Sequence, residues 1–130
     1  MTRRRAVLVG LAAGVAGCVG DTASGFDGFA DAVRDRVEVQ ALSRERDAWV
    51  LEYHVDEGPV PDAHRLAPPY ADHVPSPPHG ALAVTSLTLE NGLVADYRIP
   101  AETARRRHEG RLDAETYRDR VADRAREGTR

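Results

Sequence analysis

The sequence predicts an α+β domain in which two β-hairpins form a four-stranded antiparallel sheet, with helices packed on one face in the order α-β-β-α-β-β-α-α. Two pairs of segments alternate apolar and polar residues, and segments with helical spacing precede, separate and follow them. The chain has 130 residues, of which 42% are hydrophobic and 30% charged. That length and composition are typical of one globular domain.

The first helix is predicted over residues 25–36. Its apolar residues recur at i, i+3, i+4 and i+7, which places them on one helical face: Phe26, Phe29, Ala30 and Val33.

The first hairpin is predicted from alternation over residues 37–42 and 48–55. A turn at 45–47 pairs Val39 with Tyr53 and residue 41 with residue 51, so that each apolar residue faces another. Trp49 and Tyr53 are therefore expected in the core rather than in a ligand groove, and Tyr97 of the second hairpin with them.

The second hairpin is predicted over residues 81–100, with Asn91–Gly92 in the turn. A two-residue turn would mix the apolar and polar faces. A three-residue turn over 90–92 pairs Leu89 with Leu93 and keeps one face mostly apolar.

Between the hairpins, residues 58–80 contain seven prolines. Val60, Ala63 and Leu66 keep helical spacing, but Pro68–Pro69 should end or break the helix. A second short turn through Tyr70–Val74 is possible, and the remainder is expected to be a stiff loop. This proline-rich segment, with Tyr70, is available to a docking partner if it is not simply a solvated linker.

After Pro100, residues 101–109 predict a helix that Gly110 ends. Asp113 is placed to cap a last helix whose Tyr117 and Val121 share one face, with Leu112 packing back just before the cap.

The start of the chain predicts export and lipid attachment. Residues 2–5 are basic, residues 6–16 are mildly apolar, and Val15–Ala16–Gly17–Cys18 resembles the lipobox of secreted lipoproteins, whose cysteine carries a lipid. Arg3 and Arg4 resemble the paired arginines of the twin-arginine signal, although Ala6 stands where an aromatic residue is common, so general secretory export stays open. The apolar run is too short to cross a bilayer.

These features divide the chain into a signal peptide (1–17), a lipidated tether (18–24) and one α+β domain (25–127). Cys18 is the single cysteine, and its predicted partner is membrane lipid on the extracytoplasmic face of the cell membrane. The alternative is an N-terminal membrane segment with an incidental cysteine.

All 18 basic residues are arginine, and after removal of residues 1–17 the 15 remaining arginines against 21 acids give a net charge of −6. An acidic, lysine-free surface resembles that of proteins from salt-loving archaea, and a GC-rich bacterium is the alternative source. The negative charge argues against a nucleic-acid partner.

One resemblance covers residues 92–121, about 30 of the 130 residues. This stretch looks like the C-terminal part of uncharacterised haloarchaeal lipoproteins, and the prolines of the middle segment depart from their pattern. The resemblance implies lineage and fold, and no activity. The matching residues are Tyr97, Ala101, Gly110, Leu112, Glu115, Tyr117 and Val121.

The chain lacks nucleophile-elbow, phosphate-loop and zinc-protease motifs, so neither catalytic residues nor a cofactor are expected. The one candidate metal set is His64, His73 and His79 in the proline-rich segment 59–79, although their spacing matches no common ligand pattern.

Three functions follow as hypotheses. The first is a lipid-anchored, non-enzymatic module that binds an envelope protein or a small ligand. The second is an exported metal-binding lipoprotein that uses the histidine segment, and the third is a hydrolase with unidentified residues.

Overall fold

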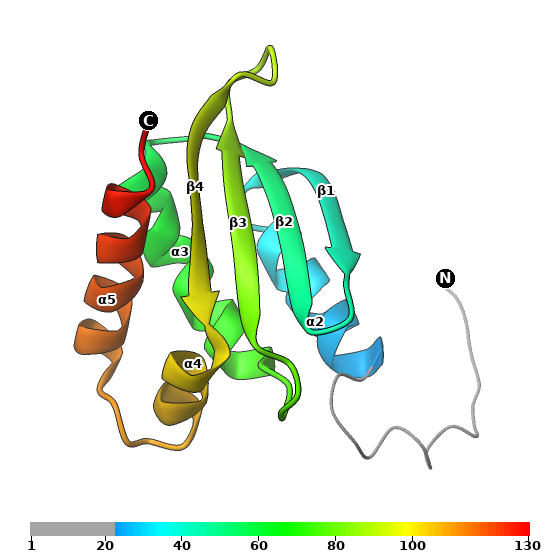
Figure 1. The fold of residues 1–130 in the computed structure, drawn as a ribbon, viewed down its shortest axis with the longest axis vertical. Helices are drawn as coiled ribbons and strands as arrows, with labels where there is room; N and C mark the ends of the chain where they lie inside the picture. The colour runs from blue at the N-terminus through cyan, green and yellow to red at the C-terminus, as the bar shows by residue number, and fades with distance from the viewer. Residues whose placement is uncertain (1–22) are drawn as a thin grey trace.

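The computed structural model describes residues 23–130, and the predicted signal peptide, Cys18, Arg3 and Arg4 lie outside them. The elements follow the predicted order α-β-β-α-β-β-α-α (Figure 1). They are α2 (Ala23–Arg34), β1 (Glu38–Arg44), β2 (Ala48–His54), α3 (Pro59–His73), β3 (Ala81–Leu87), β4 (Leu93–Pro100), α4 (Ala101–His108) and α5 (Ala114–Glu127).

The four strands form one sheet in the order β1-β2-β3-β4, which confirms the α+β class. The β1–β2 and β3–β4 pairs are antiparallel, but the central β2–β3 pair is parallel, so the expectation of a wholly antiparallel sheet is wrong at its centre. The 15-residue helix α3 spans about 22 Å, close to the length of a seven-residue strand. It therefore returns the chain to the end of the sheet where β2 began, and β3 starts there in the same direction.

The helices pack against one face of the sheet. In Figure 1, α2 and α3 lie behind the strands, α5 lies beside β4, and α4 lies below the end of β4. Trp49, Leu51 and Tyr53 of β2 point to this face and are inaccessible to solvent. The alternate residues of β2 point to the open face and are half-buried. Tyr97 of β4 is also buried, so the expectation that these aromatic residues fill the core is confirmed.

The register of the first hairpin differs from the predicted one near the turn. Arg44 pairs with Trp49 and Leu42 with Leu51, one residue away from the expected pairs. An irregularity between Val39 and Ala41 then restores the predicted pair of Val39 with Tyr53. The bulge inserts one extra residue into β1, so the apolar residues near the end of the strand still reach the core face.

The register of the second hairpin is not the predicted one. Leu87, rather than Leu89, pairs with Leu93, and Val84 pairs with Tyr97. Leu89 and Leu93 are exposed at the turn. The local apolar pattern of the turn misled the prediction, because the core buries Leu82 and Val84 of β3 and leaves Leu89 outside.

Helix α3 continues through Pro68 and Pro69, so the expected break at these prolines is wrong. Tyr70, expected in a loop, is completely buried and packs against Phe29 and Trp49. The helix loses the amide donors of both prolines, but its buried face, which includes Leu66, holds it against the sheet. Tertiary packing outweighs the local cost of the two prolines.

The C-terminal helices agree with the prediction. Helix α4 ends at His108, and Gly110 follows with a positive φ of 80°. The Asp113 side chain accepts a hydrogen bond from the amide of Thr116 at the start of α5. Hydrogen bonding to Thr116 also lowers the pKa of Asp113.

Residues 128–130 lie against the outer edge of β4. The Asp96 amide donates to the Gly128 carbonyl (3.0 Å), and the Arg130 amide donates to the Val94 carbonyl (2.8 Å). The Arg130 guanidinium also binds the Asp96 carboxylate at 3.0 Å. The C-terminal residues thus cover part of an otherwise open sheet edge.

Candidate functional site

The three predicted metal-ligand histidines have three different surroundings. His79 is buried and its Nε2 lies 2.8 Å from the Tyr70 hydroxyl. His64 is exposed on α3, and its Nε2 lies 3.9 Å from a carboxylate oxygen of Asp119 on α5.

His73, at the end of α3, packs over Gly28 of α2, where an added Cβ would lie 2.7 Å from the imidazole ring. Within residues 23–130, no group of three or more His, Cys, Asp or Glu side chains is arranged to hold a metal ion. The structure therefore does not bring His64, His73 and His79 together as one ligand set.

A buried carboxylate, Asp62, is the centre of the main internal polar cluster. It accepts a hydrogen bond from the Tyr53 hydroxyl at 3.2 Å, and the Ser86 hydroxyl donates in turn to Tyr53 at 3.0 Å. Arg65 on the next turn of α3 reaches Asp62 at 2.9 Å and Asp56 at 2.8 Å.

Two backbone amides complete the surroundings of Asp62. The amides of Asp56 and Glu57, in the loop between β2 and α3, donate to its two carboxylate oxygens at 2.9 and 3.1 Å. Asp62, Tyr53 and Ser86 have no exposed surface. The cluster therefore joins the loop, α3 and the sheet, with Arg65 at its solvent-facing side.

Three buried tyrosines have hydroxyl pKa values above the ordinary value. Burial raises the pKa of the Tyr53 hydroxyl well above its ordinary value, partly opposed by the hydrogen bond from Ser86. Burial also raises the pKa of Tyr97 and of Tyr117. All three hydroxyls therefore hold their protons to higher pH in the folded protein than in the unfolded chain.

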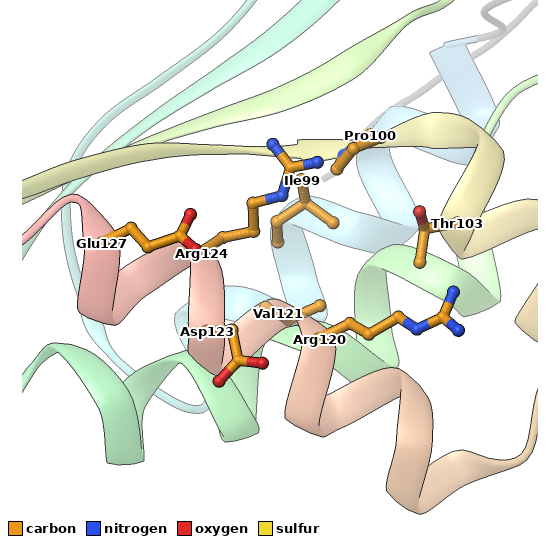
Figure 2. Close-up of a pocket in the computed structure, with 8 residues that line it drawn as sticks. All are labelled: Ile99, Pro100, Thr103, Arg120, Val121, Asp123, Arg124 and Glu127. Carbon is orange, nitrogen blue, oxygen red and sulfur yellow. The ribbon is translucent and has the colours of Figure 1, made fainter.

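A hollow on the surface lies between α5 and the junction of β4 with α4 (Figure 2), and its volume is about 280 Å³. Ile99 and Val121 form its apolar floor, and both side chains are almost completely buried. The lining residues are Ile99, Pro100, Thr103, Arg120, Val121, Asp123, Arg124 and Glu127.

Two arginines flank this hollow. In Figure 2, Arg124 extends from α5 along β4 towards Pro100, and Arg120 extends towards Thr103 of α4. Across the part of the chain that the structure describes, neither guanidinium has a hydrogen-bond or ion-pair partner. By contrast, Arg126 on the same helix pairs with Asp123 at 2.6 Å. The hollow therefore presents two free guanidinium groups, and the apolar residues behind them are buried.

Comparisons with known proteins give no match, whether with protein-family models, curated proteins or solved structures. Between Ala23 and Arg130, no helix is long and apolar enough to cross a membrane.

The hollow between β4, α4 and α5 was not predicted from the sequence. Arg120 and Arg124 lie four residues apart on one helical face with Val121 beside them, and this pattern was visible in the sequence. What the sequence did not show is that Ile99 of β4 and Thr103 of α4 lie opposite that face.

Proposed function

We propose that the protein is a lipid-anchored, extracytoplasmic binding module of a haloarchaeal cell envelope. The observation that carries this proposal is the start of the sequence, where Arg3–Arg4, a short apolar run and the Val15–Cys18 lipobox-like segment follow in order. The acidic, lysine-free composition supports a high-salt environment.

The arrangement of the fold is compatible with attachment through Cys18. Helix α2 begins at Ala23, five residues after Cys18, and five residues span at most about 17 Å. Phe26, near the start of α2, packs against Trp49 and Arg44, at the end of the sheet opposite the β3–β4 turn. A lipid on Cys18 would therefore hold that end of the domain near the membrane and direct the β3–β4 turn away from it.

The binding role is supported by the hollow with its unpaired Arg120 and Arg124. The metal-binding alternative depends on His64, His73 and His79, which face three different neighbours. A hydrolase would need named catalytic residues, and the buried Asp62 cluster offers no solvent-exposed nucleophile. We therefore carry the binding module forward.

The test is expression of the full-length wild type and of Cys18→Ser in a haloarchaeal host. For the wild type, mass spectrometry should find cleavage before Cys18 and a lipid mass on its sulfur, with the protein in the membrane fraction. Cys18→Ser should lose the lipid mass and most of the membrane association. A matched variant, Arg3→Lys with Arg4→Lys, should accumulate as uncleaved precursor if the twin-arginine route is used.

Retention of residues 1–17 together with a free thiol at Cys18 would contradict the proposal. Unchanged membrane association of Cys18→Ser would contradict it as well.

A further inference from the structure

The turn between β3 and β4 (residues 88–92) contains the one asparagine of the chain, Asn91, and Gly92 follows it directly. Both residues are exposed, on the turn that extends beyond the end of the sheet in Figure 1. An asparagine before a glycine loses its side-chain amide readily, because glycine has no β carbon to keep its backbone nitrogen away from the neighbouring side chain. The turn therefore carries a reactive pair of residues, and the contacts around them decide how fast they react.

The reaction needs only water. The Gly92 nitrogen attacks Cγ of Asn91, and the new C–N bond closes a cyclic imide. The side-chain nitrogen leaves as ammonia, with the proton that the Gly92 amide gives up. Water then adds to one of the two imide carbonyls and opens the ring. Opening on one side gives aspartate, and opening on the other gives isoaspartate, in which the main chain is longer by one methylene group.

The folded turn keeps the two reacting groups on different partners. The Gly92 amide donates to the Thr88 hydroxyl at 2.9 Å, so the attacking nitrogen is directed at Thr88. The Oδ1 atom of Asn91 lies 3.0 Å from Nε2 of His54 on β2, so the carbonyl that would be attacked is held at the sheet.

Thr88 also fixes the backbone of the turn. Its amide donates to the Gly92 carbonyl, and its carbonyl accepts from the Asn91 amide, both at 2.8 Å. Asn91 has a φ of 68°, a left-handed conformation that asparagine tolerates better than most residues. To bring the Gly92 nitrogen onto the Asn91 side chain, the backbone must rotate about bonds that these contacts hold. The turn must therefore open before the reaction occurs.

We propose that Asn91 is a site of spontaneous deamidation, and that opening of the β3–β4 turn controls its rate. Thr88 is the positioning residue that keeps the turn closed. The product places a carboxylate where the amide of Asn91 faces His54, whose other ring nitrogen already lies 3.5 Å from the Glu38 carboxylate.

The modification changes the surface that the turn presents. Leu89 lies in the turn and Leu93 directly follows it, and these are the exposed large apolar side chains among residues 23–130. Isoaspartate at position 91 would lengthen the main chain between the two leucines and so alter their spacing. This inference goes beyond the proposed function and does not depend on a lipid at Cys18.

The test is incubation of the purified full-length protein in mildly alkaline buffer, with and without concentrated guanidinium chloride. Peptide mapping by mass spectrometry measures the converted fraction of Asn91 and separates aspartate from isoaspartate. The denatured protein should convert to both products. The folded protein should convert at least roughly tenfold more slowly, because only the open fraction of the turn reacts.

Variants identify the contact that sets the rate. Folded Thr88→Ala should convert roughly fivefold faster than the wild type, since the loss of one ordinary hydrogen bond shifts the opening equilibrium by about that factor. Thr88→Ser is the matched control, because it keeps the hydroxyl and should convert at the wild-type rate. In denaturant, the wild type and both variants should convert equally fast. Gly92→Ala should convert at least roughly tenfold more slowly there, because its β carbon hinders the attacking nitrogen.

Equal conversion rates of the folded and the denatured wild type would overturn the inference. Equal rates of folded Thr88→Ala and Thr88→Ser would overturn it as well, and so would the absence of conversion in denaturant. The lipid analysis of Cys18 is a separate measurement, so failure of either test leaves the other proposal unaffected.

Discussion

At the scale of single residues, Asp62 joins the sheet, the loop after β2 and α3. One buried carboxylate accepts hydrogen bonds from a tyrosine of the sheet, two loop amides and an arginine of its own helix. An ionised buried group is tolerated only when it is this well bonded. Asp62 thereby fixes the loop that leads from β2 into α3.

We expect Asp62→Asn to lower the free energy of unfolding by about 2 to 3 kcal/mol. The asparagine amide would present hydrogens to donors that need an acceptor, and the positive charge of Arg65 would lose its main buried partner. Urea denaturation at neutral pH measures the change.

The matched control for this substitution is Asp119→Asn, an exposed carboxylate whose one ion-pair neighbour among residues 23–130 is the His64 imidazole at 3.9 Å. It should change the stability by no more than about 0.5 kcal/mol. Equal stabilities of Asp62→Asn and Asp119→Asn would show that the buried cluster does not hold the loop.

At the scale of secondary-structure elements, the two edges of the sheet differ. Strand β4 is partly covered by residues 128–130, while β1 forms the opposite edge and carries a bulge that disrupts regular pairing. The close approach of residues 128–130 to β4 requires a glycine at position 128. A Cβ at Gly128 would lie 2.0 Å from the Asp96 carbonyl oxygen.

Gly128→Ala should therefore detach residues 128–130 from β4. The Asp96 backbone cannot move away from the added methyl group as a flexible side chain could. We therefore expect the free energy of unfolding to fall by about 1 to 3 kcal/mol. Hydrogen exchange should show faster exchange of the Asp96 and Arg130 amides, both of which are bonded across this contact.

Gly80→Ala is the matched control for Gly128→Ala. A Cβ at Gly80 meets its nearest atom, the Asp47 carbonyl oxygen, only at 3.4 Å, which is ordinary contact. Its effect should be small, and the exchange of the Asp96 amide should not change. An unchanged Asp96 amide in Gly128→Ala itself would show that the contact is not maintained in solution.

At the scale of the whole molecule, all four tyrosines are buried, and the chain has no lysine. The tyrosines are therefore the main groups that titrate between pH 9 and 12 in an alkaline experiment. Burial raises the pKa of Tyr53, Tyr97 and Tyr117 above the ordinary 10.0.

The sign of the pH dependence follows from these shifts. The unfolded tyrosines release their protons near pH 10, whereas the folded ones hold them to higher pH, so the stability that they contribute is complete below pH 10 and is lost as the pH rises above it. We expect tyrosinate absorbance at 295 nm to appear together with the loss of helical circular dichroism.

The same titration in concentrated urea is the reference, and it should give an ordinary midpoint near pH 10. Tyrosinate formation near pH 10 in protein that is still folded would contradict the burial of these side chains.

The sequence by itself determined the order of the elements, the helical faces and the N-terminal cap of α5 at Asp113. These features depend on residues close together in the chain, through helical spacing, alternation and local hydrogen bonds. Trp49, Tyr53 and Tyr97 could be assigned to the core for the same reason. So could Tyr117 and Val121, which share one helical face.

Only the tertiary structure decided the parallel central strands, the continuous α3 through Pro68–Pro69 and the register of the second hairpin. In each case, burial against elements distant in the sequence outweighed a local preference. The same holds for the candidate site. Arg120 and Arg124 were visible on one helical face, but the hollow that they flank exists because β4 and α4 pack against α5, and a local pattern cannot specify that contact.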